Sequence, residues 1–269
     1  MREEGALVYP VYSRRSGGLS VGINLFPDVK RCSFNCPYCE VLPFATNTIF
    51  SQEHMEEDLR AAVSTALEQG IQIKDICFSG NGEPTMSEDF PEALKRASRV
   101  RSDLAPTAKL VLITNGFFLL NERLFSLLED AASAFPALDI WLKLDAGTSE
   151  WYKKINMSVI PHEKMIGGIK AFAARAPVTI QTMICAVDGE GPPPEENEAW
   201  EKLILSLAAA GNGPKKVQIY GKARPGCMDP KSEALPIGRL EDRAVSLRQA
   251  LTTALADSEI PIPPVEVYP

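Results

Sequence analysis

Short apolar runs alternate with amphipathic segments along nearly the whole 269-residue chain. The runs are typical of strands covered on both faces, and the segments repeat their apolar residues at helical spacing. This alternation predicts parallel strands joined by crossover helices. About six strand–helix units are recognisable, so we expect an α/β fold, a partial (β/α)6 TIM-like barrel of parallel strands. A flat doubly wound sheet is the alternative.

The predicted barrel core extends from the first strand to the last helix, over residues 19–256. Residues 1–18 are expected to form an N-terminal extension, and the Pro-rich residues 257–269 either an extended tail or a late strand. The length does not require a second domain, because barrel-type folds commonly reach it. The expected strands cover 19–26, 73–80, 109–114, 138–145, 177–185 and the beginning of 215–224.

Composition narrows the class of protein. Apolar residues make up 45% of the chain, which is enough for a sizeable core. No stretch approaches the roughly 20 apolar residues that span a bilayer, and the first ten residues lack the apolar core of a secretory signal. We therefore expect a soluble, cytoplasmic protein without membrane contact. The net charge of −7 argues against general affinity for nucleic acid.

Three of the six cysteines lie in the ten residues RCSFNCPYCE, 31–40, at the spacing C-x3-C-x2-C. A disulfide, a zinc site and an iron–sulfur cluster are the three alternatives. A reducing compartment disfavours the disulfide. Structural zinc requires a closed set of four ligands, whereas three thiolates on a four-iron cluster leave one iron open. The spacing favours iron–sulfur but leaves zinc possible, with a fourth ligand from Cys77, Cys185, Cys227 or a histidine.

Two motifs resemble the radical S-adenosylmethionine (radical SAM) superfamily. CSFNCPYC is similar to its cluster loop, with Tyr38 at the aromatic position, and GNGEP (80–84) is similar to its Gly-Gly-Glu-Pro segment, which binds the methionine amino group. Asn81 departs from that segment, where the family has glycine. More narrowly, SGNGEPT, ITNG, KLDAG and VQIYGKARP resemble the subgroup similar to wyosine-forming tRNA enzymes.

The resemblance implies a [4Fe-4S] cluster on Cys32, Cys36 and Cys39, with S-adenosylmethionine on the open iron. Reductive cleavage would then give a 5′-deoxyadenosyl radical that abstracts hydrogen from an unidentified substrate. It also implies an enzyme of oxidoreductase, transferase or lyase type and an external electron donor such as flavodoxin or ferredoxin. The substrate stays open among a tRNA base, a partner receiving a glycyl radical, a peptide and a small metabolite. A zinc-stabilised or redox-sensing binding protein is the alternative of another class.

Further candidate residues follow the predicted strands, where parallel α/β folds gather functional groups. Lys143 and Asp145 share a strand face, so they form either a charge pair in the site or a structural salt bridge. Gln181 is polar in a strand that otherwise looks buried, and internal hydrogen bonding is its alternative. The catalytic candidates are Lys143, Asp145, Tyr220 and Cys185. The cofactor-binding candidates are Tyr38, Gly80, Asn81, Gly82, Glu83, Thr114, Asn115, Lys143, Asp145, Gln181 and Arg224.

Overall fold

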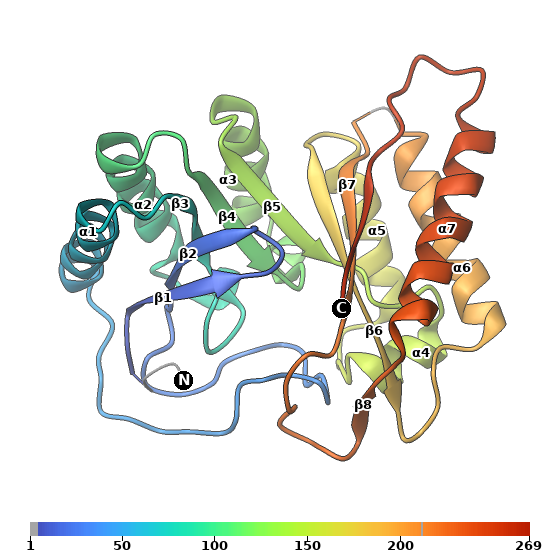
Figure 1. Ribbon diagram of the computed structural model, residues 1–269, viewed down its shortest axis with the longest axis horizontal. Coiled ribbons are helices and arrows are strands. Elements are labelled where there is room, and N and C mark those ends of the chain that lie inside the picture. Colours follow the sequence, from blue (N-terminus) through green and yellow to red (C-terminus); the bar gives the residue numbers. More distant parts are fainter. Residues whose placement is uncertain (1–4, 211) are drawn as a thin grey trace.

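A computed structural model describes residues 5–210 and 212–269. Its sheet curls into an open half-barrel with helices on the outside (Figure 1), which confirms the expected partial TIM-like barrel. The strand order is β1-β2-β3-β4-β5-β6-β7-β9, with β8 paired to β6. The described strands are β1 (Val8–Ser13), β2 (Gly18–Ile23), β3 (Ile73–Phe78), β4 (Lys109–Thr114), β5 (Leu138–Lys143), β6 (Val178–Val187), β7 (Pro214–Gly221), β8 (Ser232–Ala234) and β9 (Val265–Tyr268).

Helices connect the parallel strands β2 to β7, so the carboxyl ends of these strands all meet at one rim. Three helices begin at a side-chain cap, on Ser51, Asn121 and Thr148. The described helices are α1 (Gln52–Glu68), α2 (Phe90–Leu104), α3 (Glu122–Ala134), α4 (Ser149–Ile155), α5 (His162–Ala173), α6 (Pro194–Ala208) and α7 (Ile237–Ala254). Two short 3₁₀ turns cover Pro84–Met86 and Phe117–Leu120.

The main core lies between the sheet and the helices. Strand β6 is buried at every position, as a strand covered on both faces should be. Aromatic edge-to-face pairs fill the layer, including Phe78 with Phe90 and Phe118 with Phe172. A second apolar cluster joins the cysteine loop to α4 and to the ends of β5 and β6. This cluster fixes the cysteine loop against the inner side of the half-barrel.

Both ends of the chain add strands to the sheet. Residues 8–13, within the expected N-terminal extension, form β1, which pairs antiparallel with β2. Residues 1–4 of that extension lie outside the described part. Residues 265–268 form β9 parallel to β7, so the late-strand alternative holds for the tail. None of the described helices is long and apolar enough to cross a membrane.

Candidate active site

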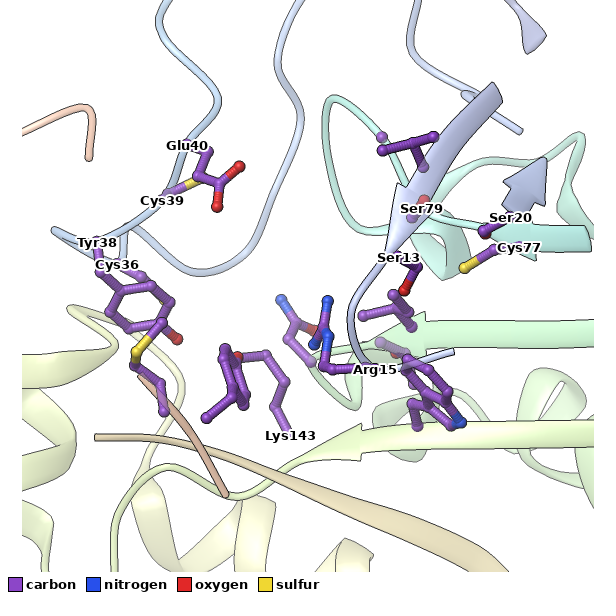
Figure 2. A pocket seen from close by; sticks show the side chains of 18 of the residues that line it. Ser13, Arg15, Ser20, Cys36, Tyr38, Cys39, Glu40, Cys77, Ser79 and Lys143 are labelled. Atoms are coloured by element: carbon purple, nitrogen blue, oxygen red, sulfur yellow. The ribbon is translucent and has the colours of Figure 1, made fainter. Parts of the chain in front are cut away.

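A cavity of ≈ 370 Å³ lies inside the half-barrel, between the cysteine loop and the β1–β2 turn. Figure 2 shows Cys36, Tyr38 and Cys39 on one side of it, Cys77 on the other, and Lys143 on the strand between them. Inward-facing side chains of β2 to β7 form its wall. A parallel barrel presents its functional groups at such a rim, so this cavity is the candidate active site.

The cysteine loop places all three motif thiols on the cavity wall. A backbone bond from Cys39 N to Cys36 O (3.1 Å) turns the loop. Two amide side chains donate to the sulfurs: Asn115 Nδ2 to Cys32 Sγ (3.4 Å) and Asn156 Nδ2 to Cys36 Sγ (3.5 Å). Hydrogen bonds to ligating sulfur are one of the means by which proteins set cluster potential.

The loop offers three free thiols as metal ligands, the number that would leave one iron of a four-iron cluster open. In the described residues no three His, Cys, Asp or Glu side chains converge at the spacing of a one-metal site. A cubane takes one thiolate on each iron, so its ligands stand further apart than those of zinc. Burial raises the pKa of Cys32 to about 12 and of Cys36 to about 11. Metal binding would therefore release protons from these thiols.

The GNGEP segment supports the cysteine loop through its backbone. Arg31 N donates to Asn81 O (3.2 Å), and Glu83 N donates to Arg31 O (2.8 Å). A Cβ on Gly82 would stand 1.9 Å from Arg31 O, so only glycine fits this close approach. The Asn81 amide donates to Phe26 O (3.3 Å), and Asn81 is not among the cavity-lining residues, whereas Gly80 and Gly82 are.

Glu83 joins two strand-end loops. Its carboxylate accepts bonds from Thr85 N (3.1 Å) and Thr85 Oγ1 (2.6 Å). It also accepts from Thr114 Oγ1 (2.7 Å) and Asn115 N (2.7 Å), which lie on the next loop. Burial raises the pKa of Glu83, although these neutral donors oppose the shift. The predicted residues Thr114 and Asn115 thus meet Glu83, and their positions depend on it.

Asp145 stands at the centre of the other half of the site. It is 4% exposed and accepts from Tyr38 OH (2.5 Å), Asn156 Nδ2 (2.7 Å) and Met183 N (2.8 Å). Lys143 Nζ lies 3.3 Å from the carboxylate. Donors from the cysteine loop, from the residue after α4 and from β6 therefore meet on one buried carboxylate.

Lys143 connects Asp145 to Tyr220. Its ammonium donates to Tyr220 OH and lies 5.1 Å from the ring centroids of both Tyr38 and Tyr220. Burial opposes the charge on Lys143, but Asp145 and Tyr220 outweigh it and raise the pKa. Of the catalytic candidates, Lys143 thus contacts both Asp145 and Tyr220.

Gln181 is already paired on both sides. Its amide nitrogen donates to Gln218 Oε1 (2.7 Å), and its oxygen accepts from Arg15 Nη1 (2.9 Å). This is the internal hydrogen bonding that the sequence left as the alternative to cofactor binding. Arg224 lies at the rim, where it pairs with Glu40 (2.7 Å).

Two cysteines outside the motif take different positions. Cys185 is fully buried in the apolar cluster beneath the cysteine loop and is not among the residues that line the cavity. Cys227 lies beside the loop, and its backbone N–H donates to Cys39 O (2.7 Å). The loop after β7 therefore holds the last motif cysteine in place.

Sequence reasoning missed two functional candidates. Asn156 follows α4, a helix of seven residues that the apolar pattern does not reveal. Arg15 lies in the β1–β2 turn, within the expected extension, yet it lines the cavity. The motifs that located the other candidates do not include either residue, and tertiary contacts bring both to the site.

Comparisons with known proteins agree with this geometry. A family model described as the radical SAM superfamily matches residues 27–197. A protein named GTPase Obg from Brachyspira hyodysenteriae is 30% identical over 166 residues, which are 61% of this chain and 22% of that protein. A UPF0026 protein from Synechocystis is 29% identical over 231 residues, which are 82% of this chain and 76% of the relative.

Solved structures share the fold. A radical SAM methyltransferase from Sphaerobacter thermophilus gives a TM-score of 0.58 at 16% identity, covering 93% of this chain and 66% of that one. Streptococcus suis SuiB bound to S-adenosylmethionine gives 0.52 at 12% identity, covering 90% and 47%. This chain spans less than two thirds of both structures and of the Obg-named relative. Since the family model covers more than half of its length, the chain belongs to the radical SAM superfamily.

Proposed function

We propose that this protein is a radical SAM enzyme that holds a [4Fe-4S] cluster through Cys32, Cys36 and Cys39. The observation that carries the proposal is that all three thiols line one cavity, opposite inward-facing side chains of the barrel strands. The superfamily uses S-adenosylmethionine and an iron–sulfur cluster, and its enzymes generally need an electron donor and a substrate. An electron passed to the bound cluster would cleave S-adenosylmethionine and start hydrogen abstraction from the substrate.

The residues around the thiols would orient and shield the cluster. Asn115 and Asn156 each direct an amide N–H at a motif sulfur, which stabilises the thiolate form. Phe34 and Tyr38 are 7% and 8% exposed and lie in one apolar cluster with Cys36, the buried motif cysteine. Gly80 and Gly82 line the cavity, and the absence of their side chains lets Asn24 and Arg31 pack close to this segment.

Glu83 would act by holding this frame together. Its oxygens already accept from Thr85, Thr114 and Asn115, so its carboxylate fixes the two loops that face the cluster. The resemblance assigns this segment to the methionine amino group. We therefore expect the substitution Glu83→Gln to weaken S-adenosylmethionine binding by displacing these loops.

For the substrate, only classes of molecule are proposed. The segments that resemble wyosine-forming enzymes suggest a tRNA base, but the net charge of −7 disfavours RNA. A peptide, a metabolite or a partner enzyme fits the open half-barrel as well. Flavodoxin or ferredoxin is the proposed electron donor.

The test is anaerobic. The full chain is reconstituted with iron and sulfide, both are quantified, and 5′-deoxyadenosine is measured after addition of dithionite and S-adenosylmethionine. We expect close to four irons per chain, and 5′-deoxyadenosine only when all components are present. Cys36→Ala should lose most of the iron and all of the product.

Cys77→Ala is the matched control for iron binding, because Cys77 is a cysteine outside the motif, on the other side of the cavity. It should keep its iron. Zinc in place of iron, without product, would contradict the proposal and favour the zinc-stabilised or redox-sensing protein.

A further inference from the structure

A guanidinium extends into the cavity from the side opposite the cysteine loop. Figure 2 shows Arg15 pointing from the β1–β2 turn toward the middle of the cavity, near Lys143. Its Cζ lies 4.8 Å from the centroid of the Tyr220 ring and 5.5 Å from that of Trp141. Both rings line the cavity, so they hold the guanidinium in place by cation–π contact.

The partners of Arg15 hold it without neutralising it. Nη1 donates to the amide oxygen of Gln181 (2.9 Å), a neutral acceptor. Gln181 presents that oxygen because its own nitrogen is bonded to Gln218 (2.7 Å). The backbone oxygen of Arg15 accepts from Tyr268 OH (3.3 Å), which ties the turn to the opposite edge of the sheet.

Some of the described arginines are paired with acids, and Arg15 is not one of them. Arg31, Arg60, Arg96 and Arg224 each lie within 3.1 Å of a carboxylate oxygen. Within residues 5–210 and 212–269, no ion pair involves Arg15. Among the described residues, Arg15 is therefore a held cation inside the cavity with no carboxylate within ion-pair distance.

Contacts through Tyr220 and Lys143 also connect Arg15 to the side of the cavity formed by the cysteine loop. Tyr220 lies within about 5 Å of both cations, with its centroid 4.8 Å from Arg15 Cζ and 5.1 Å from Lys143 Nζ. Lys143 in turn lies 5.1 Å from the Tyr38 ring, which belongs to the cysteine loop. A molecule bound between the loop and Arg15 would therefore lie along one continuous row of side chains.

We propose that the substrate of this enzyme carries a carboxylate or phosphate group, and that Arg15 binds this group at the β1–β2 side of the cavity. A planar guanidinium fixed by two rings and one amide offers paired N–H donors to an oxyanion. This inference rests on the proposed function only for calling the ligand a substrate. The anion site itself is defined by Arg15, Tyr220, Trp141 and Gln181.

Calorimetry on the full chain tests the anion site with two probes, inorganic phosphate and succinate. We expect the wild type to bind at least one, and Arg15→Gln to weaken that binding at least tenfold. A preference for one probe identifies the anion as phosphate or carboxylate. Arg239→Gln is the matched control, since Arg239 is an exposed arginine on α7 and this substitution changes the net charge equally. It should leave the dissociation constant within twofold.

A second measurement needs no variant. Phenylglyoxal modification of the wild-type chain, mapped by peptide mass spectrometry, should be slowed at Arg15 by the bound probe and unaffected at Arg239. Absence of binding by both probes, equal binding by wild type and Arg15→Gln, or modification of Arg15 unaffected by probe would each overturn the inference. The 5′-deoxyadenosine assay on wild type is separate, so anion binding without that product would overturn the proposed function alone.

Discussion

Strand β5 carries a buried aspartate near each end, and the two are neutralised differently. At the start of β5, Asp139 pairs with Lys109 and Lys215, whose side chains are 58% and 36% exposed. After its end, Asp145 pairs with Lys143, whose side chain is 13% exposed. The first pairs extend outward to solvent, whereas the second is enclosed in the candidate active site.

This difference matches the two ends of a parallel barrel. The amino end of the strands serves stability, and the carboxyl end carries chemistry. Burial alone would raise the pKa of Asp139, but Lys215, Thr179 and Lys109 outweigh it and hold the pKa below its usual value. An enclosed ion pair stabilises little in net terms, because both groups lose their hydration. Its position at the rim agrees with the proposal that Lys143 and Asp145 belong to the active site.

The largest effect should come from Asp145→Asn. Lys143 would remain buried without its counter-ion, and breaking a buried pair costs about 3–5 kcal/mol. Urea unfolding of the cluster-free chain measures this loss. The double variant Lys143→Met/Asp145→Asn should lose less than Asp145→Asn alone, because the unpaired charge is gone. If Asp145→Asn lost less than about 1 kcal/mol, water would already reach the Lys143–Asp145 pair. The contrast between the enclosed pair at Asp145 and the exposed pairs at Asp139 would then be wrong.

Glu83→Gln extends the comparison to a buried carboxylate held by neutral donors alone. The new amide would place an N–H against Thr114, Thr85 or Asn115, which are all donors to Glu83. An unmet buried donor costs about 1–3 kcal/mol. Glu88→Gln, an exposed neighbour, should change the unfolding free energy by less than about 0.5 kcal/mol. Equal losses of unfolding free energy in the two variants would show that Glu83 does not hold the two loops together.

A smaller loss is expected for Asp139→Asn. Lys109 and Lys215 can turn back to water, and pairs with partly exposed lysines contribute about 1 kcal/mol or less. The retained amide oxygen can still accept from Thr179 (2.8 Å in the wild type). Urea unfolding at neutral pH measures this loss of unfolding free energy. A loss as large as that of Asp145→Asn would show that both ends of β5 depend equally on their ion pairs.

The smallest effect is in the pH dependence, where the signs should be opposite. The pKa of Asp139 is lowered by folding, so its contribution is present above pH ~4 and is lost as the pH falls through the folded pKa. The pKa of Glu83 is raised, so its ionisation costs stability as the pH rises above ~4.3. Subtracting the unfolding profile of each Asn or Gln variant from that of wild type isolates the two slopes. If unfolding free energy changed with pH in the same direction for both residues, the opposite pKa shifts of Asp139 and Glu83 would be contradicted.

The fold was largely readable because its elements repeat a simple pattern. Strand β4 occupies the expected residues 109–114, since a continuous apolar run needs cover on both faces. Strand β1 was missed because it is an edge strand with Pro10 and exposed positions, which carries no apolar alternation. Helix α4 was missed because seven residues are too few for a helical period to show.

The residues of the candidate site could be predicted from the sequence only where they belong to short contiguous motifs. The cysteine spacing and GNGEP located the loop and its support, since each is a contiguous segment. The closeness of Lys143 and Asp145 was predicted from their two-residue spacing, although β5 ends at Lys143 and Asp145 follows it, where the sequence predicted a strand over 138–145. The contacts of Gln181 with Arg15 and of Asp145 with Tyr38 did not follow, because these pairs are 166 and 107 positions apart.

By itself the sequence determined the half-barrel class, the superfamily and the loop that would carry the cluster, because periodicity and spacing are local properties of a chain. Only the tertiary structure decided which side chains meet inside. Curvature of the sheet brings the β1–β2 turn to Gln181 within β6, and Arg15 becomes a cavity residue. The same curvature encloses Asp145 among four segments. Burial there turns ordinary polar residues into a linked charge network, since the low dielectric strengthens every contact they make.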